Sequence, residues 1–246
     1  MLGIIDWGIG GIGIYNLVKE QMPGAGVLYF SDTGATPYGK MGRRELAGRL
    51  DAVIEFLKDK GMTRLIIGCN AASTAIPDLR EHGIPIEGVI TPAVEMAAKL
   101  KPEKLGVIGG RRTILSGVYR RAFAERGIDI EQRIAQPLSA LIESGDLASS
   151  KLHAEAERIL TPIRNRSHIL LACTHYPAIQ RVLEKYVSGH AKFINPAAAV
   201  VKKLRNVEDG TVHDDRFFTT GDPEQMKRSA KLAFGVDLGV VKKVSI

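Results

Sequence analysis

The sequence predicts an α/β protein with two similar lobes of mainly parallel sheet flanked by helices, and three observations lead to this fold class. Apolar, β-branched runs alternate along the chain with stretches whose apolar residues recur at helical spacing. The opening phrase Leu-Gly-Ile-Ile-Asp-Trp-Gly-Ile-Gly-Gly has a shorter counterpart, Leu-Gly-Val-Ile-Gly-Gly, at residues 105–110. Each half then reaches a cysteine at the end of another apolar run, where ligands bind in parallel sheets.

Each predicted strand is a short apolar run bounded by turn residues or by a helical pattern. The predicted strands are Leu2–Asp6, Val27–Phe30, Arg64–Gly68, Ile86–Ile90, Leu105–Ile108, His168–Ala172 and Lys192–Ile194. The amphipathic segments predicted as helices include Arg44–Lys58, Thr113–Arg126 and Lys151–Arg164. Residues 217–221 and the helix after them repeat no motif and are expected to pack onto a lobe. We assign residues 1–98 and 206–246 to the first lobe and residues 99–205 to the second, with the active site in the cleft between them.

The composition is that of a globular protein, with a formal net charge of +7. The basic residues are scattered and not interleaved with aromatic side chains, so they predict a solvated surface rather than a nucleic-acid interface. No signal-peptide pattern opens the chain, and no apolar run has the length of a bilayer span. We therefore expect a cytoplasmic protein that contacts neither nucleic acid nor membrane and keeps its two cysteines reduced.

The two cysteines, Cys69 and Cys173, each lie between a predicted strand and a predicted helix start. A thiol at that junction faces the positive end of the helix dipole, which favours the thiolate. Two facing lobes would bring both thiols to one cleft. Other interpretations stay open: one nucleophilic cysteine with His175 as its base, or cysteines that only fill space. A metal site is disfavoured because Cys173 and His175 are too close for a paired-ligand motif and no C-x-x-C is present.

The glycines after the first strand fit a second interpretation. Gly8, Gly10 and Gly13 match G-x-G-x-x-G, and Asp32 ends the next strand, where a dinucleotide site places its ribose-binding acid. Against a dinucleotide site, the preceding Asp-Trp puts a charge and a bulky ring into the turn. We favour glycines that let the turn approach a small ligand. The loop after Asp32 offers N–H groups and hydroxyls for a carboxylate, or is an ordinary Asx and proline turn.

Taken together, the motifs resemble the glutamate racemase branch of the cofactor-independent aspartate/glutamate racemase superfamily, and the similarity runs nearly end to end. The opening Asp6-x-Gly-x-Gly-Gly is similar to the family's Asp-Ser-Gly-x-Gly-Gly. The remaining matches are Asp32-Thr33 with Pro37-Tyr38-Gly39, Cys69-Asn70, Leu141-Ile-Glu143-Ser-Gly145, Cys173-Thr174-His175-Tyr176-Pro177 and Thr219-Thr-Gly-Asp222.

The resemblance implies a two-base mechanism with no pyridoxal phosphate, metal or other cofactor. One cysteine, as thiolate, removes the α-proton of a bound amino acid, and the other, as thiol, protonates the opposite face. The resemblance also implies that Asp6 assists Cys69, the base toward the D-amino acid. Glu143 and His175 assist Cys173, the base toward the L-form. The residues expected to bind the substrate are Trp7, Pro37, Tyr38, Gly39, Asn70, Ala71 and Thr174.

The activity that the resemblance implies is interconversion of L- and D-glutamate, supplying D-glutamate for peptidoglycan; a homodimer is left open. Trp7 stands where the family has serine, and Ala71 where it has threonine. Because both replaced residues are substrate-contacting hydroxyls in the family, we predict an altered substrate preference or weaker action on glutamate. The alternatives are a racemase of aspartate or another amino acid, a catalytically impaired binding homologue, and a nucleotide-dependent oxidoreductase that uses the glycine turn.

Overall fold

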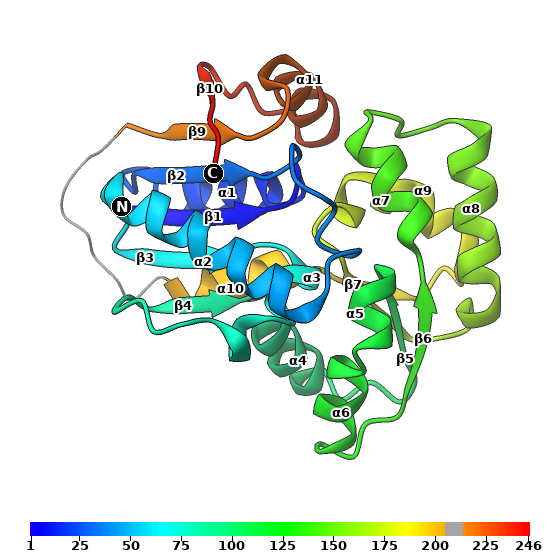
Figure 1. The fold of residues 1–246 in the computed structure, drawn as a ribbon. Helices are drawn as coiled ribbons and strands as arrows, with labels where there is room; N and C mark the ends of the chain where they lie inside the picture. The colour runs from blue at the N-terminus through cyan, green and yellow to red at the C-terminus, as the bar shows by residue number, and fades with distance from the viewer. Residues whose placement is uncertain (205–213) are drawn as a thin grey trace.

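The chain folds into two parallel sheets that lie side by side, each covered by helices on both faces (Figure 1). The computed structural model describes residues 1–204 and 214–246. The predicted fold class, two mainly parallel α/β lobes, is confirmed. The lobe boundary predicted between residues 205 and 206 lies outside the described residues.

The first sheet has six strands in the order β10-β9-β2-β1-β3-β4. Its strands are β1 Leu2–Asp6, β2 Val27–Ser31, β3 Arg64–Ile67, β4 Ile86–Gly88, β9 Arg216–Thr219 and β10 Val241–Lys243. All neighbouring strands run parallel, and the register pairs Asp6 with Ser31 at the carboxyl ends of β1 and β2. Asp6 therefore leaves the sheet at the edge where parallel sheets bind ligands.

The second sheet has four parallel strands in the order β6-β5-β7-β8. They are β5 Leu105–Gly109, β6 Ile130–Ile134, β7 His168–Ala172 and β8 Lys192–Ile194. Gly109 pairs with Ala172, so the turn after β5 and the segment that begins with Cys173 leave this sheet at the same edge.

The helices bury one apolar face against the sheets. They are α1 Ile12–Gln21, α2 Arg43–Asp59, α3 Asn70–Ser73, α4 Ile90–Lys99, α5 Arg111–Leu115, α6 Val118–Ala124, α7 Gln136–Glu143, α8 Ser150–Leu160, α9 Gln180–Leu183, α10 Pro196–Leu204 and α11 Pro223–Phe234. Short 3₁₀ turns span Ile76–Asp78, Thr161–Ile163, Tyr176–Ile179 and Glu184–Tyr186. In the part of the chain that the structure describes, none of these helices has the length and hydropathy of a bilayer-spanning helix.

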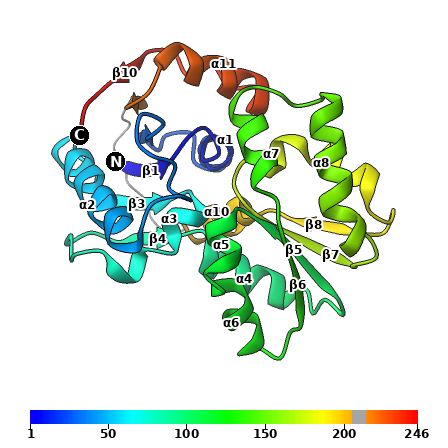
Figure 2. The ribbon, with the colours of Figure 1, turned by 45° about the vertical axis from the view of Figure 1, so that its right-hand side comes forward.

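Two helices pack across the predicted lobe division. Buried residues of α4 share a hydrophobic cluster with β5 and β7 of the second sheet, although α4 lies almost entirely within residues 1–98. Buried residues of α10, within residues 99–205, share a cluster with α1 and β1 of the first sheet. These helices stand at the junction of the two sheets in Figure 2. The division by residue ranges stays a prediction, and this exchange of helices joins the lobes through apolar packing.

Several predicted elements need correction. The strand predicted over Ile86–Ile90 ends at Gly88, because Ile90 begins α4. The helix predicted over Thr113–Arg126 is two helices, separated where Gly117 adopts a left-handed φ of 69°. Strand β6 was not predicted, since its polar residues hide the strand pattern. The stretch at residues 217–221 does pack onto the first lobe, because β9 extends its sheet beside β2.

Candidate active site

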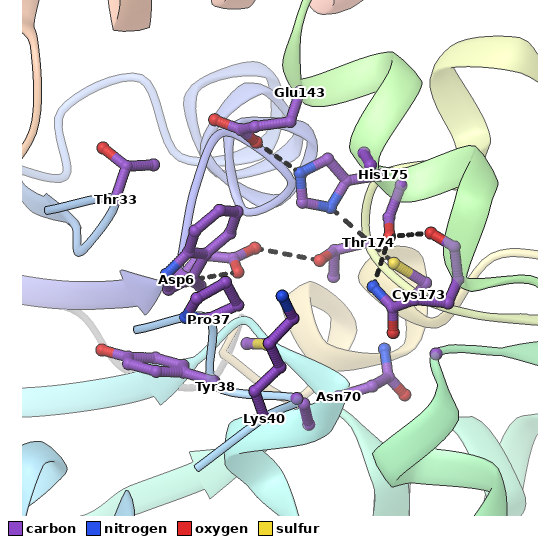
Figure 3. A pocket seen from close by; sticks show the side chains of 18 of the residues that line it. Asp6, Thr33, Pro37, Tyr38, Lys40, Asn70, Glu143, Cys173, Thr174 and His175 are labelled. Atoms are coloured by element: carbon purple, nitrogen blue, oxygen red, sulfur yellow. Dashed lines mark hydrogen bonds and ion pairs between the residues drawn. The ribbon is translucent and has the colours of Figure 1, made fainter. Parts of the chain in front are cut away.

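Between the lobes lies a cavity of about 570 Å³, lined by segments that follow the carboxyl ends of strands from both sheets (Figure 3). Every residue predicted for the site lines it: Asp6, Trp7, Pro37, Tyr38, Gly39, Cys69, Asn70, Ala71, Glu143, Cys173, Thr174 and His175. The structure therefore brings together residues that are as far as 169 positions apart in the sequence (6 to 175).

Cys69 enters the cavity from the first lobe, as the N-cap of the short helix α3. It is a free cysteine, partly exposed toward the cavity. Burial raises the pKa of the Cys69 thiol well above its ordinary value, the Asp6 carboxylate adds to this, and the backbone N–H groups of Ala72 and Ala71 act in the opposite direction. The predicted effect of the helix start is thus present at Cys69, since these two N–H groups favour the thiolate, but desolvation outweighs it and the pKa is raised.

Cys173 enters from the second lobe, directly after β7, and belongs to a hydrogen-bonded chain. Its sulfur lies 3.7 Å from Nδ1 of His175. The other ring nitrogen, Nε2, lies 2.6 Å from Oε2 of Glu143, at the end of α7. Burial lowers the pKa of His175, but hydrogen bonds and charge from Cys173 and Glu143 outweigh it and raise that pKa well above its ordinary value. The arrangement favours an imidazolium at His175, beside Cys173.

Asp6, at the end of β1, crosses the cleft. Its Oδ2 accepts a hydrogen bond of 2.9 Å from the hydroxyl of Thr174, and its Oδ1 accepts one of 2.6 Å from the Trp7 N–H. Burial raises the pKa of Asp6 above its ordinary value, against the lowering effect of His175 and Thr174. The hydrogen bond of Asp6 thus reaches the segment that follows Cys173, whereas its effect on Cys69 acts through charge.

The glycine turn after β1 serves contact between the lobes. A Cβ at Gly8 would collide with the carboxylate of Glu143, and one at Gly10 with Thr174 and His175. The Ile9 N–H donates to Oε2 of Glu143 at 3.0 Å. The prediction that these glycines admit a small ligand needs correction, because the groups they admit are side chains of the second lobe.

Asp32 is not available to a ribose. Its side chain is fully buried and accepts two hydrogen bonds from the guanidinium of Arg49, at 2.8 and 2.6 Å. The hydroxyls of Tyr38 and Thr220 also donate to it. The dinucleotide interpretation therefore loses its acidic residue. Tyr38 lines the cavity with its hydroxyl directed away, toward Asp32 (Figure 3).

Asn70 is the clearest unpaired donor of the cavity. It is 3% exposed, and its Oδ1 accepts a hydrogen bond of 2.7 Å from the hydroxyl of Tyr119 in α6. Its buried Nδ2 has no partner within the described residues. A buried amide donor without a partner destabilises the folded protein, and a ligand that supplies the acceptor removes this cost. Asn70 is therefore suited to bind a carboxylate.

Trp7 and Ala71 give the cavity an apolar lining at the two positions where the family resemblance leads one to expect hydroxyl groups. The indole N–H of Trp7 donates to the carbonyl of Ala35 at 3.1 Å, so it is already paired. Its ring packs against the hydrophobic cluster beneath α2, together with Ala71. Neither residue offers a free hydrogen-bond donor from its side chain.

Sequence reasoning missed other residues that line the cavity, among them Lys40, Arg111, Thr113 and Gln136. Thr113 and Arg111 follow the Gly-Gly turn after β5, which corresponds to the opening glycine turn, so the internal similarity could have found them. Gln136 follows the unpredicted strand β6. No group of three or more His, Cys, Asp and Glu side chains among residues 1–204 and 214–246 is arranged to hold a metal ion.

Comparisons with known proteins agree with this geometry. A sequence model described as Asp/Glu/Hydantoin racemase matches residues 2–204. The glutamate racemase of Aquifex aeolicus is 30% identical over 243 residues, which cover 96% of this chain and 95% of that protein. The glutamate racemase of Beutenbergia cavernae is 32% identical over 264 residues, covering 96% and 90%.

Solved structures give the same result. Glutamate racemase isoform RacE1 from Bacillus anthracis superposes with a TM-score of 0.90 at 25% identity, covering 100% of this chain and 97% of that one. The Francisella tularensis glutamate racemase in complex with D-glutamate superposes with a TM-score of 0.88 at 25% identity, covering 99% and 97%. The chain therefore belongs to the Asp/Glu/hydantoin racemase family.

Proposed function

We propose that this protein is a cofactor-independent racemase that interconverts L- and D-glutamate, with Cys69 and Cys173 as its two bases. The observation that carries the proposal is that the two free cysteines line one cavity from opposite lobes. Inversion at an α-carbon needs a base on one face and an acid on the other, and two opposed thiols meet that need. The names of the relatives in the family support glutamate as the substrate.

In the direction from D-glutamate, the Cys69 thiolate takes the α-proton and the Cys173 thiol supplies a proton to the opposite face. Cys173 is left as a thiolate beside the His175 imidazolium, which Glu143 holds in place. The reverse direction exchanges the two roles. Burial raises the pKa of Asp6 above its ordinary value, which suits this carboxyl group to exchange a proton on the Cys69 side.

The α-proton of an amino acid is a very weak acid, so the carbanion needs preplaced donors. We infer that the unpaired Nδ2 of Asn70 binds the α-carboxylate, where negative charge develops. Burial also suits Cys69 to act as a base, because a poorly solvated thiolate binds a proton more strongly than a solvated one. We further propose that the D-glutamate formed supplies peptidoglycan synthesis, the role that the family resemblance implies.

The test is α-proton exchange. The protein is incubated with L- or D-glutamate in deuterated water. Deuterium at the α-carbon is followed by mass spectrometry, and optical rotation is followed by polarimetry. A racemase incorporates deuterium as the rotation falls, and a Cys69→Ala/Cys173→Ala variant does neither. Aspartate, alanine and glutamine are run in parallel. Absence of exchange with glutamate would refute the proposal, and exchange with another amino acid alone would identify a different substrate.

A further inference from the structure

We propose that Lys40 is a specificity-determining residue that binds the side-chain carboxylate of the substrate and so restricts this site to acidic amino acids. The inference rests on the proposed function and adds to it the residue that recognises the side-chain carboxylate of the substrate. Lys40 follows Tyr38 and Gly39 directly in the loop before α2 and lines the cavity. In Figure 3 its side chain rises from that loop and its ammonium points into the cavity.

The Lys40 ammonium has no hydrogen bond or ion pair to any residue that the structure describes, whereas the guanidinium groups of Arg49 and Arg112 are engaged. Arg49 is paired with Asp32, at 2.6 Å. Arg112 donates to the carbonyl of Met41 at 2.7 Å and to the hydroxyl of Thr74 at 3.0 Å. Because the Lys40 ammonium has no such partner and points into the cavity, it is free to bind an anion there.

The acids of the cavity do not neutralise this charge. Asp6 is occupied by Thr174 and the Trp7 N–H, and Glu143 by His175 and the Ile9 N–H. The third acid, Asp222, is the N-cap of α11 and accepts hydrogen bonds from the first N–H groups of that helix. The cation is therefore left for a ligand.

A substrate with two carboxylates needs two sets of donors, and the cavity has few that are unpaired. Asn70 supplies one beside Cys69. The indole N–H of Trp7 is committed to Ala35, and the Ala71 side chain has no donor. Lys40 and Arg111 both line the cavity without a side-chain partner among the described residues, and of the two it is the Lys40 ammonium that Figure 3 shows pointing into the cavity. The flexible four-carbon stem of Lys40 lets one compact charge follow carboxylates at different distances from the α-carbon.

The experiment compares ligands that differ only in charge. Glutamine is close to isosteric with glutamate and lacks the side-chain carboxylate, so binding of both is titrated by calorimetry to the full chain. Lys40→Gln is expected to weaken glutamate binding about tenfold, equivalent to about 1.4 kcal/mol, while glutamine binding changes less than about twofold. Lys40→Arg should retain most of the preference. Arg44→Gln is the matched control, because it removes one positive charge four residues away, outside the cavity.

An equal loss of glutamate affinity in Arg44→Gln and Lys40→Gln would mean that only the general field attracts the substrate, and would overturn the proposal. So would an unchanged ratio of glutamate to glutamine affinity in Lys40→Gln, or no glutamate binding by the unmodified protein. The proposed function can fail separately. If glutamate binds in a Lys40-dependent way but no α-proton exchange occurs, the role of Lys40 in binding the side-chain carboxylate stands and the racemase proposal is refuted.

Discussion

The hydroxyl of Thr174 donates a hydrogen bond of 2.9 Å to the Asp6 carboxylate, and this bond joins the end of β1 in the first sheet to the segment that follows β7 in the second. Other hydrogen bonds also join the two lobes, among them those from the Ile9 N–H to Glu143 and from Tyr119 to Asn70. The side chains proposed for chemistry thus also hold the lobes together. A substitution that separates the lobes is expected to impair both the stability of the fold and the activity.

Gly8→Ala tests that coupling. The added methyl group collides with the Glu143 carboxylate, so we expect the free energy of unfolding to fall by about 1–3 kcal/mol. Displacing Glu143 also displaces His175, and misplacement of about 1 Å commonly costs about a hundredfold in rate, so kcat should fall by at least tenfold. Urea unfolding and α-proton exchange measure the two effects.

The control is Gly48→Ala on the exposed face of α2, where an added Cβ meets nothing within 4 Å. Alanine inside a helix is favoured over glycine, so this variant should gain about 0.5–1 kcal/mol and keep its activity. Wild-type activity in Gly8→Ala would show that the glycine turn and Glu143 need not lie so close.

Removal of either thiol should stop inversion. We expect Cys69→Ala and Cys173→Ala each to abolish racemisation in both directions, because each direction uses one cysteine as base and the other as acid. Polarimetry follows the optical rotation of glutamate, and thermal melting establishes that each variant is folded. Racemisation retained by a folded variant with a single cysteine would contradict the two-base proposal.

The sequence predicts the lobes and the residues of the site better than it predicts the contacts among those residues. Short apolar runs locate β1, β5 and β7, and the residues that follow them are the ones that line the cavity. Local patterns cannot show that Gly8 is required by Glu143, which lies 135 residues later. They also miss β6, because its partly buried edge strand carries polar residues, and with it they miss Gln136.

The pKa of His175 gives a pH-dependent stability. Burial disfavours the imidazolium, but Cys173 and Glu143 outweigh it and raise the pKa well above its ordinary value. A group whose pKa is raised by folding contributes its full stabilisation below its unfolded pKa, about 6.5 for histidine, and loses it as the pH rises through the folded pKa. The loss of unfolding free energy caused by His175→Gln should therefore be larger at about pH 6 than at about pH 9.5.

Urea unfolding of both proteins across that range measures the difference. His153→Gln removes an imidazole that hydrogen-bonds the Tyr186 hydroxyl outside the cavity, and it controls for the general effect of losing a histidine. A His175→Gln penalty that is constant or grows with pH would show that His175 is not held as a cation in the folded protein.

Ala71 and Trp7 decide whether glutamate is bound as well as the family resemblance implies. Ala71→Thr places a hydroxyl at the second position of α3, directly after Asn70, and both positions line the cavity. A hydrogen bond to a charged group contributes about 1.5–3 kcal/mol, so a substrate carboxylate that accepts one should gain roughly tenfold or more in kcat/KM. Ala71→Val is the matched control, since valine has the shape of threonine without the hydroxyl.

Trp7→Ser is expected to act differently, because the Trp7 ring packs against the cluster beneath α2 and its indole N–H is already paired with Ala35. Truncating a packed aromatic ring costs about 3–5 kcal/mol when it is fully buried, so this partly buried one should cost less, and the cavity should widen beside Asp6. The double variant Trp7→Ser/Ala71→Thr is then assayed with glutamate, aspartate and glutamine. A shift of the kcat/KM ratios toward glutamate supports an altered substrate preference in the natural chain. Unchanged ratios, with Ala71→Thr no better than Ala71→Val, would mean that the two departures do not determine which amino acid the cysteines act upon.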